Sequence, residues 1–264
     1  MKPTLCTGVF VLFACLNLHA QVDPAVIKSW PGESELIAAD LLGQVYIVKA
    51  GNLTKYSETG DSLFTWSDPA SGSITSVDAS DPLRILVYHR DFNLVRFLNN
   101  RLTPLSDPIK LDNLNCTNPL ALATSRQGGF WILDGTTSRL RYFDHQLNLQ
   151  VESSPLSFSG IQPTSGIRLI ESANRLWLQV TGKEIRQYDL FGNLTRHIPV
   201  SALAVSLYGQ QLLFIYPDKI TLFSDPFKPE TSVTEWTGNP LLEAFLLDKR
   251  LLVRTAKEVL LINH

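Results

Sequence analysis

The chain has 264 residues, of which 44% are hydrophobic and 18% are charged, with 23 basic against 25 acidic side chains. This composition is typical of a globular protein and excludes a disordered or collagen-like chain. A net charge of −2 and a pI near 6.2 offer no basic surface to a polyanion, so we expect no nucleic-acid binding.

The first residues have the order of a secretory signal peptide. Lys2 precedes an apolar run from Leu5 to Leu16, and the small residue Ala20 stands just before Gln21. The run is shorter than the roughly 20 apolar residues that cross a bilayer as a helix. We therefore predict a signal peptide over residues 1–20, export to the periplasm and no transmembrane segment.

A second interpretation of the leader stays open. Leu12-Phe13-Ala14-Cys15 resembles a bacterial lipobox, which would make the protein an outer-membrane lipoprotein attached through Cys15. If the leader is simply removed, Cys116 is the only remaining cysteine, so no intrachain disulfide can form. A single unpaired cysteine is more often a small buried apolar residue than a nucleophile, and we expect that role for Cys116.

The rest of the chain is a weak repeat of short strands. Stretches of alternating or continuous apolar residues are separated by Gly, Asn, Asp or Pro, and no helical period is sustained. The clearest recurring strand ends in an aromatic residue, replaced by isoleucine in the last copy; these end residues are Tyr56, Phe97, Phe143, Tyr188, Phe223 and Ile262. They are separated by 41, 46, 45, 35 and 39 residues.

Each copy contains four strands. A second strand lies about ten residues before the aromatic end, a strand of smaller residues precedes it, and a fourth strand follows, as in Ser62 to Trp66 or Leu102 to Ile109. Four strands in about 40–45 residues are the signature of a β-propeller blade. We predict an all-β, six-bladed β-propeller of four-stranded antiparallel blades, forming a single domain over residues 21–264. A pair of β-sandwiches is the alternative fold.

The ends of the chain predict how the ring closes. The sixth copy supplies only three strands, while residues 25–30 form an unassigned strand before the first copy. Pairing this N-terminal strand with the last blade would complete the blade and cover both exposed edges. We therefore expect the N-terminal strand to close the ring.

No motif of a known catalytic or cofactor site is present. The sequence contains no Gly-x-Ser-x-Gly, His-Glu-x-x-His, Cys-x-x-Cys, Gly-x-Gly-x-x-Gly or phosphate-binding loop. These absences give no basis for assigning a catalytic residue, a metal ligand or a cofactor.

One hairpin combines residues that could contact a ligand or partner. His89, Arg90, Asp91 and Phe92 follow a predicted second strand, and hairpins between second and third strands lie on the propeller face where ligands usually bind. A histidine beside charged residues could also perform acid–base chemistry, because its pKa lies near neutrality. We take these four residues as candidate partner-binding residues, with a local ion pair at a hairpin tip as the structural alternative.

Four acidic residues end predicted first strands. In a ring they could converge near the axis and hold calcium, which takes six to eight oxygen ligands. They are Asp40, Asp78, Glu171 and Asp248. The same positions are common in turns, where Asp caps the backbone, so we expect a structural role and assign no metal ligand, with a calcium site as the alternative.

The tryptophans fall into two groups. Trp131 and Trp177 occupy matching second-strand positions, which indicates repeated core packing. Trp66 and Trp236 lie on or near outer strands, so we add them to the candidate partner-binding residues, with packing between blades as the alternative.

Three segments carry a resemblance to a known family. LIAADLLGQVYIV, GSITSVDASDPLRILVYHRDFNLVRFL and GFWILDGTTSRLRYFD resemble an exported propeller-like family of Bacteroidetes-type Gram-negative bacteria, mostly of unassigned activity. The chain is also similar to the periplasmic plug subunit of the type 9 secretion translocon, which closes the inner mouth of an outer-membrane barrel. The resemblance implies an exported propeller with a protein partner and supplies no catalytic residues.

Two functions from different classes follow. The first is a non-catalytic periplasmic propeller that binds a protein partner, such as an outer-membrane β-barrel translocon, through a rigid face. The second is a propeller hydrolase, lactonase or lyase acting on a sugar, with calcium or the acidic residues near the channel. A glycan-binding module is a third alternative, and it requires exposed tryptophans on one face.

Overall fold

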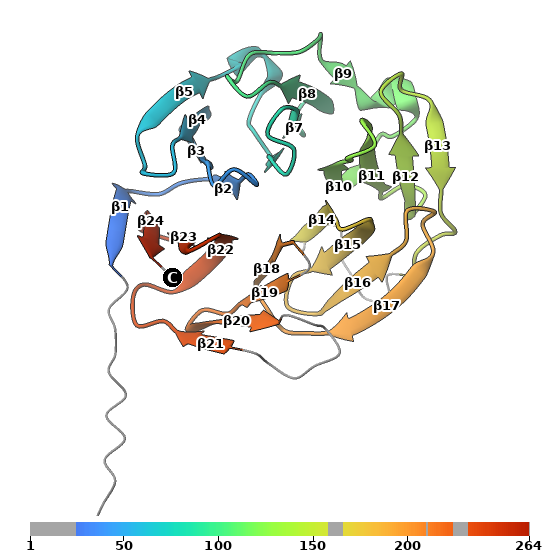
Figure 1. Cartoon of the computed structure of the whole chain (residues 1–264). Coiled ribbons are helices and arrows are strands. Elements are labelled where there is room, and N and C mark those ends of the chain that lie inside the picture. Colours follow the sequence, from blue (N-terminus) through green and yellow to red (C-terminus); the bar gives the residue numbers. More distant parts are fainter. Residues whose placement is uncertain (1–24, 158–165, 210, 224–231, 264) are drawn as a thin grey trace, which may run out of the picture.

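The computed structural model describes residues 25–157, 166–209, 211–223 and 232–263, which form six four-stranded antiparallel sheets arranged as a ring. The sheets surround a central axis like the blades of a propeller (Figure 1). This confirms the predicted six-bladed β-propeller. Two short 3₁₀ helices, η1 (Pro69–Ser71) and η2 (Leu111–Leu114), lie in blade connections. Within the described ranges, no helix has the length and apolar character needed to cross a membrane.

The strands of the first three blades follow the chain from the inside of the ring to the outside. Blade 1 contains β2 (Leu36–Ala39), β3 (Val45–Lys49), β4 (Asn52–Tyr56) and β5 (Ser62–Trp66). Blade 2 contains β6 (Ser76–Asp78), β7 (Ile85–His89), β8 (Leu94–Leu98) and β9 (Ile109–Lys110). Blade 3 contains β10 (Pro119–Thr124), β11 (Phe130–Asp134), β12 (Arg139–Phe143) and β13 (Leu149–Glu152).

The remaining blades repeat the pattern, except that the outer strand of blade 6 comes from the other end of the chain. Blade 4 contains β14 (Ile167–Ser172), β15 (Arg175–Val180), β16 (Glu184–Tyr188) and β17 (Leu194–Pro199). Blade 5 contains β18 (Ala204–Tyr208), β19 (Gln211–Ile215), β20 (Lys219–Phe223) and β21 (Ser232–Glu235). Blade 6 contains β22 (Leu241–Leu247), β23 (Arg250–Thr255), β24 (Glu258–Asn263) and β1 (Val26–Pro31).

The ring closes as the sequence predicts. β1 pairs antiparallel with β24, with Trp30 opposite Val259, so the N-terminal strand completes the last blade. The indole of Trp30 packs on the ring of Tyr56 in blade 1, at 4.9 Å between ring centroids. The closing strand therefore binds both blades that meet at the seam.

The hydrophobic core consists of layers between blades. Six clusters of buried side chains are present in the described residues, and each combines side chains from two neighbouring blades. Trp131 and Trp177 are buried in two of these layers, which confirms the predicted core role of both tryptophans. Side chains of a strand point alternately to opposite faces of its sheet, so each blade supplies apolar residues to both neighbours.

The two faces of the ring are built differently. We call the side with the turns between first and second and between third and fourth strands the turn face, and the opposite side the connection face. In four blades whose third-to-fourth turn is described, a side-chain oxygen at the first residue of the turn accepts backbone N–H bonds from positions two and four residues later. These first residues are Ser57, Asn99, Asp144 and Asp189.

One predicted strand is much shorter than expected. The sequence predicts the fourth strand of blade 2 from Leu102 to Ile109, whereas β9 contains only Ile109 and Lys110 and an isolated bridge joins Leu98 to Pro104. Prolines have no N–H to donate to a ladder, and Pro104 and Pro108 interrupt this segment. The predicted signal peptide over residues 1–20, and Cys15 with it, lies outside the described residues.

Candidate functional site: the channel and the connection face

The inner strands of all six blades enclose a narrow central channel. Its cavity has a volume of about 110 Å³ and a mixed lining of small apolar and polar side chains. The apolar part includes Ala38, Val77 and Leu122, and the polar part includes Arg168 and Ser206. In the described part of the chain, Ser206 Oγ is buried without a hydrogen-bond partner.

The acidic residues expected near the axis are engaged in structural hydrogen bonds. Asp40 Oδ1 accepts the N–H groups of Leu42 and Gln44 at 2.9 and 3.0 Å, and its Oδ2 accepts the hydroxyl of Tyr46 at 2.9 Å. Burial and the neighbouring carboxylate raise the pKa of Tyr46, so this phenol stays protonated. Asp40 thus shapes its own turn, which is the structural role expected for it.

Two further members of the acidic set connect blades. Asp78 Oδ2 accepts hydrogen bonds from both the backbone N–H and the hydroxyl of Thr124 in blade 3, at 2.8 and 3.0 Å. Glu171 in blade 4 accepts the indole N–H of Trp131 at 2.8 Å and the backbone N–H of Arg126 at 3.1 Å. Charged acceptors bonded to neutral donors across a seam are strong structural contacts, so these carboxylates hold adjacent blades together.

The fourth acidic residue lies in a turn. Asp248 occupies the hairpin between β22 and β23 with φ of 55°, a conformation that Asp and Asn tolerate better than other side chains. Among the described residues, no group of three or more His, Cys, Asp or Glu side chains could hold a metal ion. Hydrogen bonds within the protein account for Asp40, Asp78 and Glu171, in line with the structural role expected for them.

An ion pair crosses the channel near the connection face. Arg168 of β14 and Glu243 of β22 belong to blades separated by a whole blade, and their side chains meet at 2.6 Å. Arg254 of β23 approaches the same carboxylate at 3.4 Å. The guanidinium of Arg168 also lies over the ring of Phe245 at 4.9 Å. The sequence could not reveal this cluster, because no motif links Arg168 to Glu243.

The candidate hairpin divides into a buried and an exposed part. His89 is 0% exposed at the end of β7, where the loop that enters blade 2 covers it; its Nδ1 lies 3.1 Å from the carbonyl oxygen of Gly72. Burial lowers the pKa of His89 below its ordinary value, so the ring is neutral at pH 7. His89 thus lies in the interior and not at a hairpin tip, which corrects its assignment as a partner-contacting residue.

The next three residues lie at the surface. Phe92 is 58% exposed, and the exposed Arg90 lines a pocket of about 200 Å³ between blades 2 and 3. The carboxylate of Asp91 accepts the backbone N–H of Ser73 at 2.8 Å and so fastens the hairpin to the covering loop. The hydroxyl of Tyr88, also in the pocket wall, lies 3.4 Å from Asn93 Oδ1. Arg90, Asp91 and Phe92 remain candidate partner-binding residues, on a hairpin held rigidly.

The two tryptophan candidates are packed between blades. Trp66 is half-buried against the core layer of blades 1 and 2, and its ring meets that of His89 nearly edge-on, at 6.0 Å between centroids. Trp236 packs on the layer of blades 5 and 6 and donates its indole N–H to the carbonyl of Asn239 at 2.7 Å. Both indoles are tied into seams, as the structural alternative expects, while both side chains are only half-buried, so contact with a partner stays a prediction for them.

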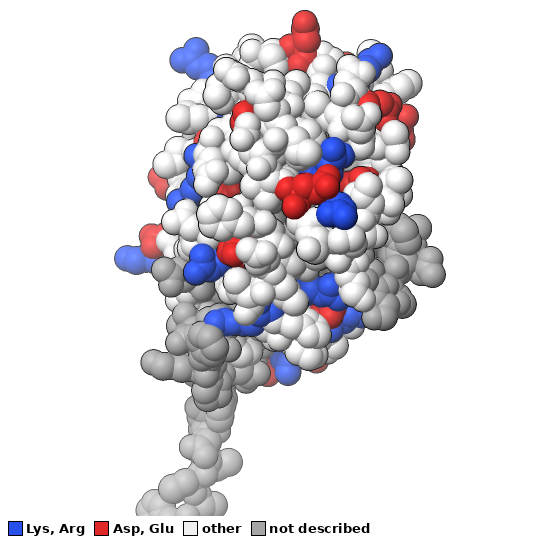
Figure 2. All heavy atoms as spheres, turned by 90° about the vertical axis from the view of Figure 1, so that its right-hand side faces the viewer, with Lys and Arg blue, Asp and Glu red and all other residues white. Residues whose placement is uncertain are grey.

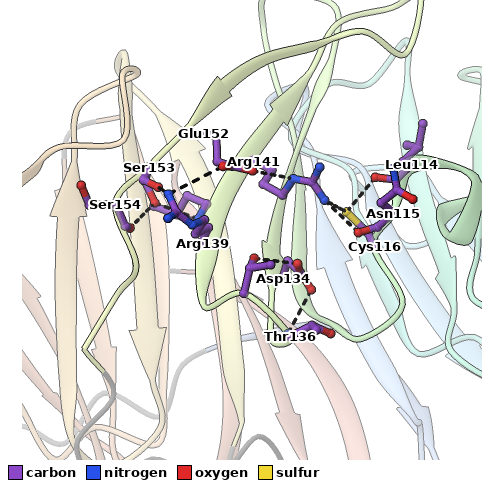
Figure 3. Close-up of polar contacts among 12 residues, drawn as sticks. Leu114, Asn115, Cys116, Asp134, Thr136, Arg139, Arg141, Glu152, Ser153 and Ser154 are labelled. Atoms are coloured by element: carbon purple, nitrogen blue, oxygen red, sulfur yellow. Dashed lines mark hydrogen bonds and ion pairs between the residues drawn. The ribbon is translucent and has the colours of Figure 1, made fainter.

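The free cysteine lies in a polar cluster at the blade 2–3 seam. Arg141 donates through Nη1 to Cys116 Sγ at 3.0 Å and to the carbonyl of Asn115 at 2.9 Å, while Glu152 lies 3.3 Å from its Nε (Figure 3). Burial raises the pKa of Cys116 to about 11. The thiol is therefore protonated at neutral pH and inert, which confirms the predicted role as a buried structural residue.

Sequence reasoning also missed exposed apolar residues on the turn face. The turn that follows β2 carries Leu41 and Leu42, and the turn that follows β6 carries Leu83; all three are exposed. Their only sequence signal is an apolar residue at a turn position where polar residues prevail. Figure 2 shows the side of the ring with β13 and β17, where charged side chains of both signs are scattered over a mostly uncharged surface.

No known protein family and no curated protein matches this sequence. Solved structures do match its fold. A streptogramin B lyase has 14% identity and a TM-score of 0.60, over 89% of this chain and 93% of that chain. The WD40 domain of Neurospora crassa Pan2 has 8% identity and a TM-score of 0.59, over 88% and 89%. BBS1N in complex with ARL6DN has 15% identity and a TM-score of 0.54, over 84% and 75%. At these identities the likeness extends to the propeller fold alone.

Proposed function

We propose that this protein is a non-catalytic propeller subunit that binds a protein partner through its connection face. The observation that carries the proposal is the rigid hairpin of blade 2, on which Phe92 stands 58% exposed beside the pocket lined by Arg90. Aromatic and arginine side chains next to a pocket are the usual centres of binding energy in protein interfaces. The same fold binds a protein in the BBS1N complex with ARL6DN, which supports a docking role.

The finer part of the proposal concerns place and partner. The leader predicted over residues 1–20 directs the chain to the periplasm, and the family resemblance suggests a partner in the outer membrane. We therefore propose that the propeller docks on the periplasmic side of an outer-membrane protein-secretion translocon and closes its inner mouth. Attachment through Cys15 would place it on the same membrane surface.

The test is affinity purification from detergent-solubilised envelopes, followed by mass spectrometry. We expect a stoichiometric outer-membrane partner with the wild-type protein and its loss with Phe92→Ala and Arg90→Ala. Phe191→Ala removes an exposed aromatic ring of similar size from the turn face, so it is the matched control and should retain the partner. A wild-type preparation without a stoichiometric partner, or one whose partner resists both substitutions, contradicts the proposal.

An enzymatic role is the second candidate, favoured by the charged cluster at the channel. Arg168, Glu243 and Arg254 meet near the connection face, where a substrate entering the channel would contact them, and a streptogramin B lyase shares the fold. A lyase or hydrolase acting on a sugar would use Glu243 as its base. We would assay lyase and glycosidase substrates with the wild-type protein and Glu243→Gln. Turnover abolished by this substitution supports the enzyme; turnover that persists contradicts this site.

A further inference from the structure

A wide groove lies on the turn face between blades 3 and 4, away from the hairpin of the proposed function. Its volume is about 900 Å³, within the range of roughly 300–1,000 Å³ typical of ligand sites. The wall from blade 3 includes Gln127 and Asp144, and the wall from blade 4 includes Asn174, Arg175 and Phe191. No residue of the groove takes part in the docking hairpin, so its occupant would be a separate ligand.

An aromatic ring stands at one side of the groove. Phe191 is 76% exposed, the highest value among the large apolar side chains of the described residues. Its backbone is fixed, since its N–H and that of Asn193 both donate to Asp189 Oδ1 at 2.9 Å. Among the described residues, three other blades have this turn and carry polar side chains at the position of Phe191; these are Thr59, Arg101 and Gln146. A rigidly presented ring in water offers a flat apolar platform to a ligand.

Side chains with unused hydrogen-bonding groups complete the groove. Gln127 and Asn174 are exposed, and among the described residues their side-chain amides bond to no protein group. Arg175 uses one of its donors on the backbone carbonyl of Asn174 at 3.1 Å and keeps the others free. An amide both donates and accepts hydrogen bonds, which matches a hydroxyl group, since a hydroxyl does the same.

The carboxylates of the groove are acceptors of fixed position. Hydrogen bonds from Asn148 and Gln150 hold the pKa of Asp144 below its ordinary value, so it stays ionised at neutral pH. Asp189 is likewise kept ionised. Burial acts to raise its pKa, but hydrogen bonds from Asn193 outweigh this effect and lower the pKa below its ordinary value. Opposite charge is supplied nearby by Arg175, so the groove lining carries charges of both signs. This balance is unsuited to a polyanion or a polycation.

From this combination we infer that the groove between blades 3 and 4 binds a neutral oligosaccharide. Pyranose rings have one face of C–H groups that packs on an aromatic ring such as Phe191, and a rim of hydroxyls that pairs with planar amides and carboxylates. The groove is open to solvent, so several sugar units of a chain can lie along it while only part of their surface is buried. Binding of this kind needs no catalytic group, and it goes beyond the proposed docking of a protein.

The experiment measures saccharide binding to the purified protein by saturation-transfer NMR and calorimetry. The probes are hexasaccharides of β-1,4-linked glucose, β-1,3-linked glucose and β-1,4-linked N-acetylglucosamine, at up to millimolar concentration. We expect at least one to bind the wild-type protein, and Phe191→Ala to weaken that binding by about tenfold or more. Asn174→Gly, which removes the amide and accepts the φ of 57° at this position, together with Gln127→Ala should weaken it further, whereas Phe92→Ala, which removes a ring from the opposite face, should leave it unchanged.

Three results overturn the inference. They are the absence of binding by every hexasaccharide, binding that Phe191→Ala leaves unaltered, and selective binding of hexalysine or hexaglutamate in the groove, which would assign it to a charged peptide. Because partner recovery is tested with Phe92→Ala and saccharide binding with Phe191→Ala, failure of the two proposals can be distinguished. All substituted side chains are exposed, so we expect the variants to fold like the wild-type protein. Equal midpoints of thermal unfolding check this.

Discussion

The turn face repeats one structural device from blade to blade, whereas the segments of the connection face vary. On the turn face, acidic and amide side chains at the starts of turns bind backbone N–H groups, as Asp144 and Asp189 do in blades 3 and 4. On the connection face, the segments between blades differ in length, and two of them contain 3₁₀ helices. The repeated turns support the ring, whereas departures from the repeat, such as the exposed Phe191 on the turn face and the varied segments of the connection face, are places where a function can be added.

This difference leads to a graded expectation for stability. Substituting an acidic residue that serves the ring should cost several kcal/mol, because buried donors lose their acceptor. Substituting an exposed residue of the docking hairpin should cost almost nothing. The following substitutions test whether the two faces differ in this way.

The largest effect is expected for Glu171. Glu171→Ala removes the acceptor of the buried indole N–H of Trp131 and of the Arg126 N–H, and should lower the free energy of unfolding by about 3 kcal/mol. Urea denaturation followed by tryptophan fluorescence measures the change. Glu33→Ala, at an exposed glutamate, is the control and should stay within about 0.5 kcal/mol of wild type. An equal loss for both variants would contradict the structural role of Glu171.

Substitution of Asp40 should lower the free energy of unfolding by less, and asparagine at this position should restore most of it. Asp40→Ala removes the acceptor of the Tyr46 hydroxyl and of two turn N–H groups, so we expect about 2 kcal/mol of destabilisation. Asp40→Asn keeps an oxygen for the turn and should recover most of this stability. If Asp40 instead served a metal, calcium would raise the wild-type melting temperature and neither variant would respond; a calcium-dependent shift would therefore contradict the turn assignment.

Local sequence features were sufficient to predict the blades. Each aromatic residue used to count the repeats, from Tyr56 to Phe223, is the last or, for Phe97, the last but one residue of a third strand, because alternation along a strand and the turn after it are encoded within about ten residues. The N-terminal strand of the ring could be placed because one blade was a strand short. β9 was overestimated because apolar residues around two prolines were read as a ladder.

The candidate site depended on contacts that the sequence does not encode locally. His89 is followed directly by the exposed residues Arg90 to Phe92, yet it is buried and its ring contacts the carbonyl of Gly72, from the segment entering the blade. Arg168 and Glu243 are 75 residues apart and meet only because the ring brings their inner strands to one channel. Burial and cross-channel pairing arise from the arrangement of the blades, so adjacency in sequence could not supply them.

His89 provides a pH-dependent test of the connection face. Its pKa is lowered from the ordinary 6.5 by burial, with Asp68 acting to raise it and Arg96 to lower it. Below pH 6.5 the unfolded chain therefore binds a proton that the folded protein resists, so stability falls as pH decreases from 6.5 toward the folded-state pKa. The slope from this one group approaches at most about 1.4 kcal/mol per pH unit.

The measurement compares urea denaturation at pH 7.5 and pH 5.5 for the wild-type protein and His89→Gln. Glutamine can still donate to the Gly72 carbonyl and cannot titrate, so the variant should lose less stability on acidification than wild type does. Identical pH dependence in the two proteins would show that His89 titrates normally and that the loop over it opens readily.

The smallest effect on stability is expected for Phe92, the residue whose substitution should weaken partner binding most. The ring of Phe92 is 58% exposed, so Phe92→Ala should change the free energy of unfolding by no more than about 0.5 kcal/mol while abolishing recovery of the partner. A large loss of stability would mean that the ring packs on its own blade. Unchanged stability together with lost binding would mean that the ring of Phe92 serves recognition. The shape of the hairpin would then depend on the contact between Asp91 and the loop at Ser73.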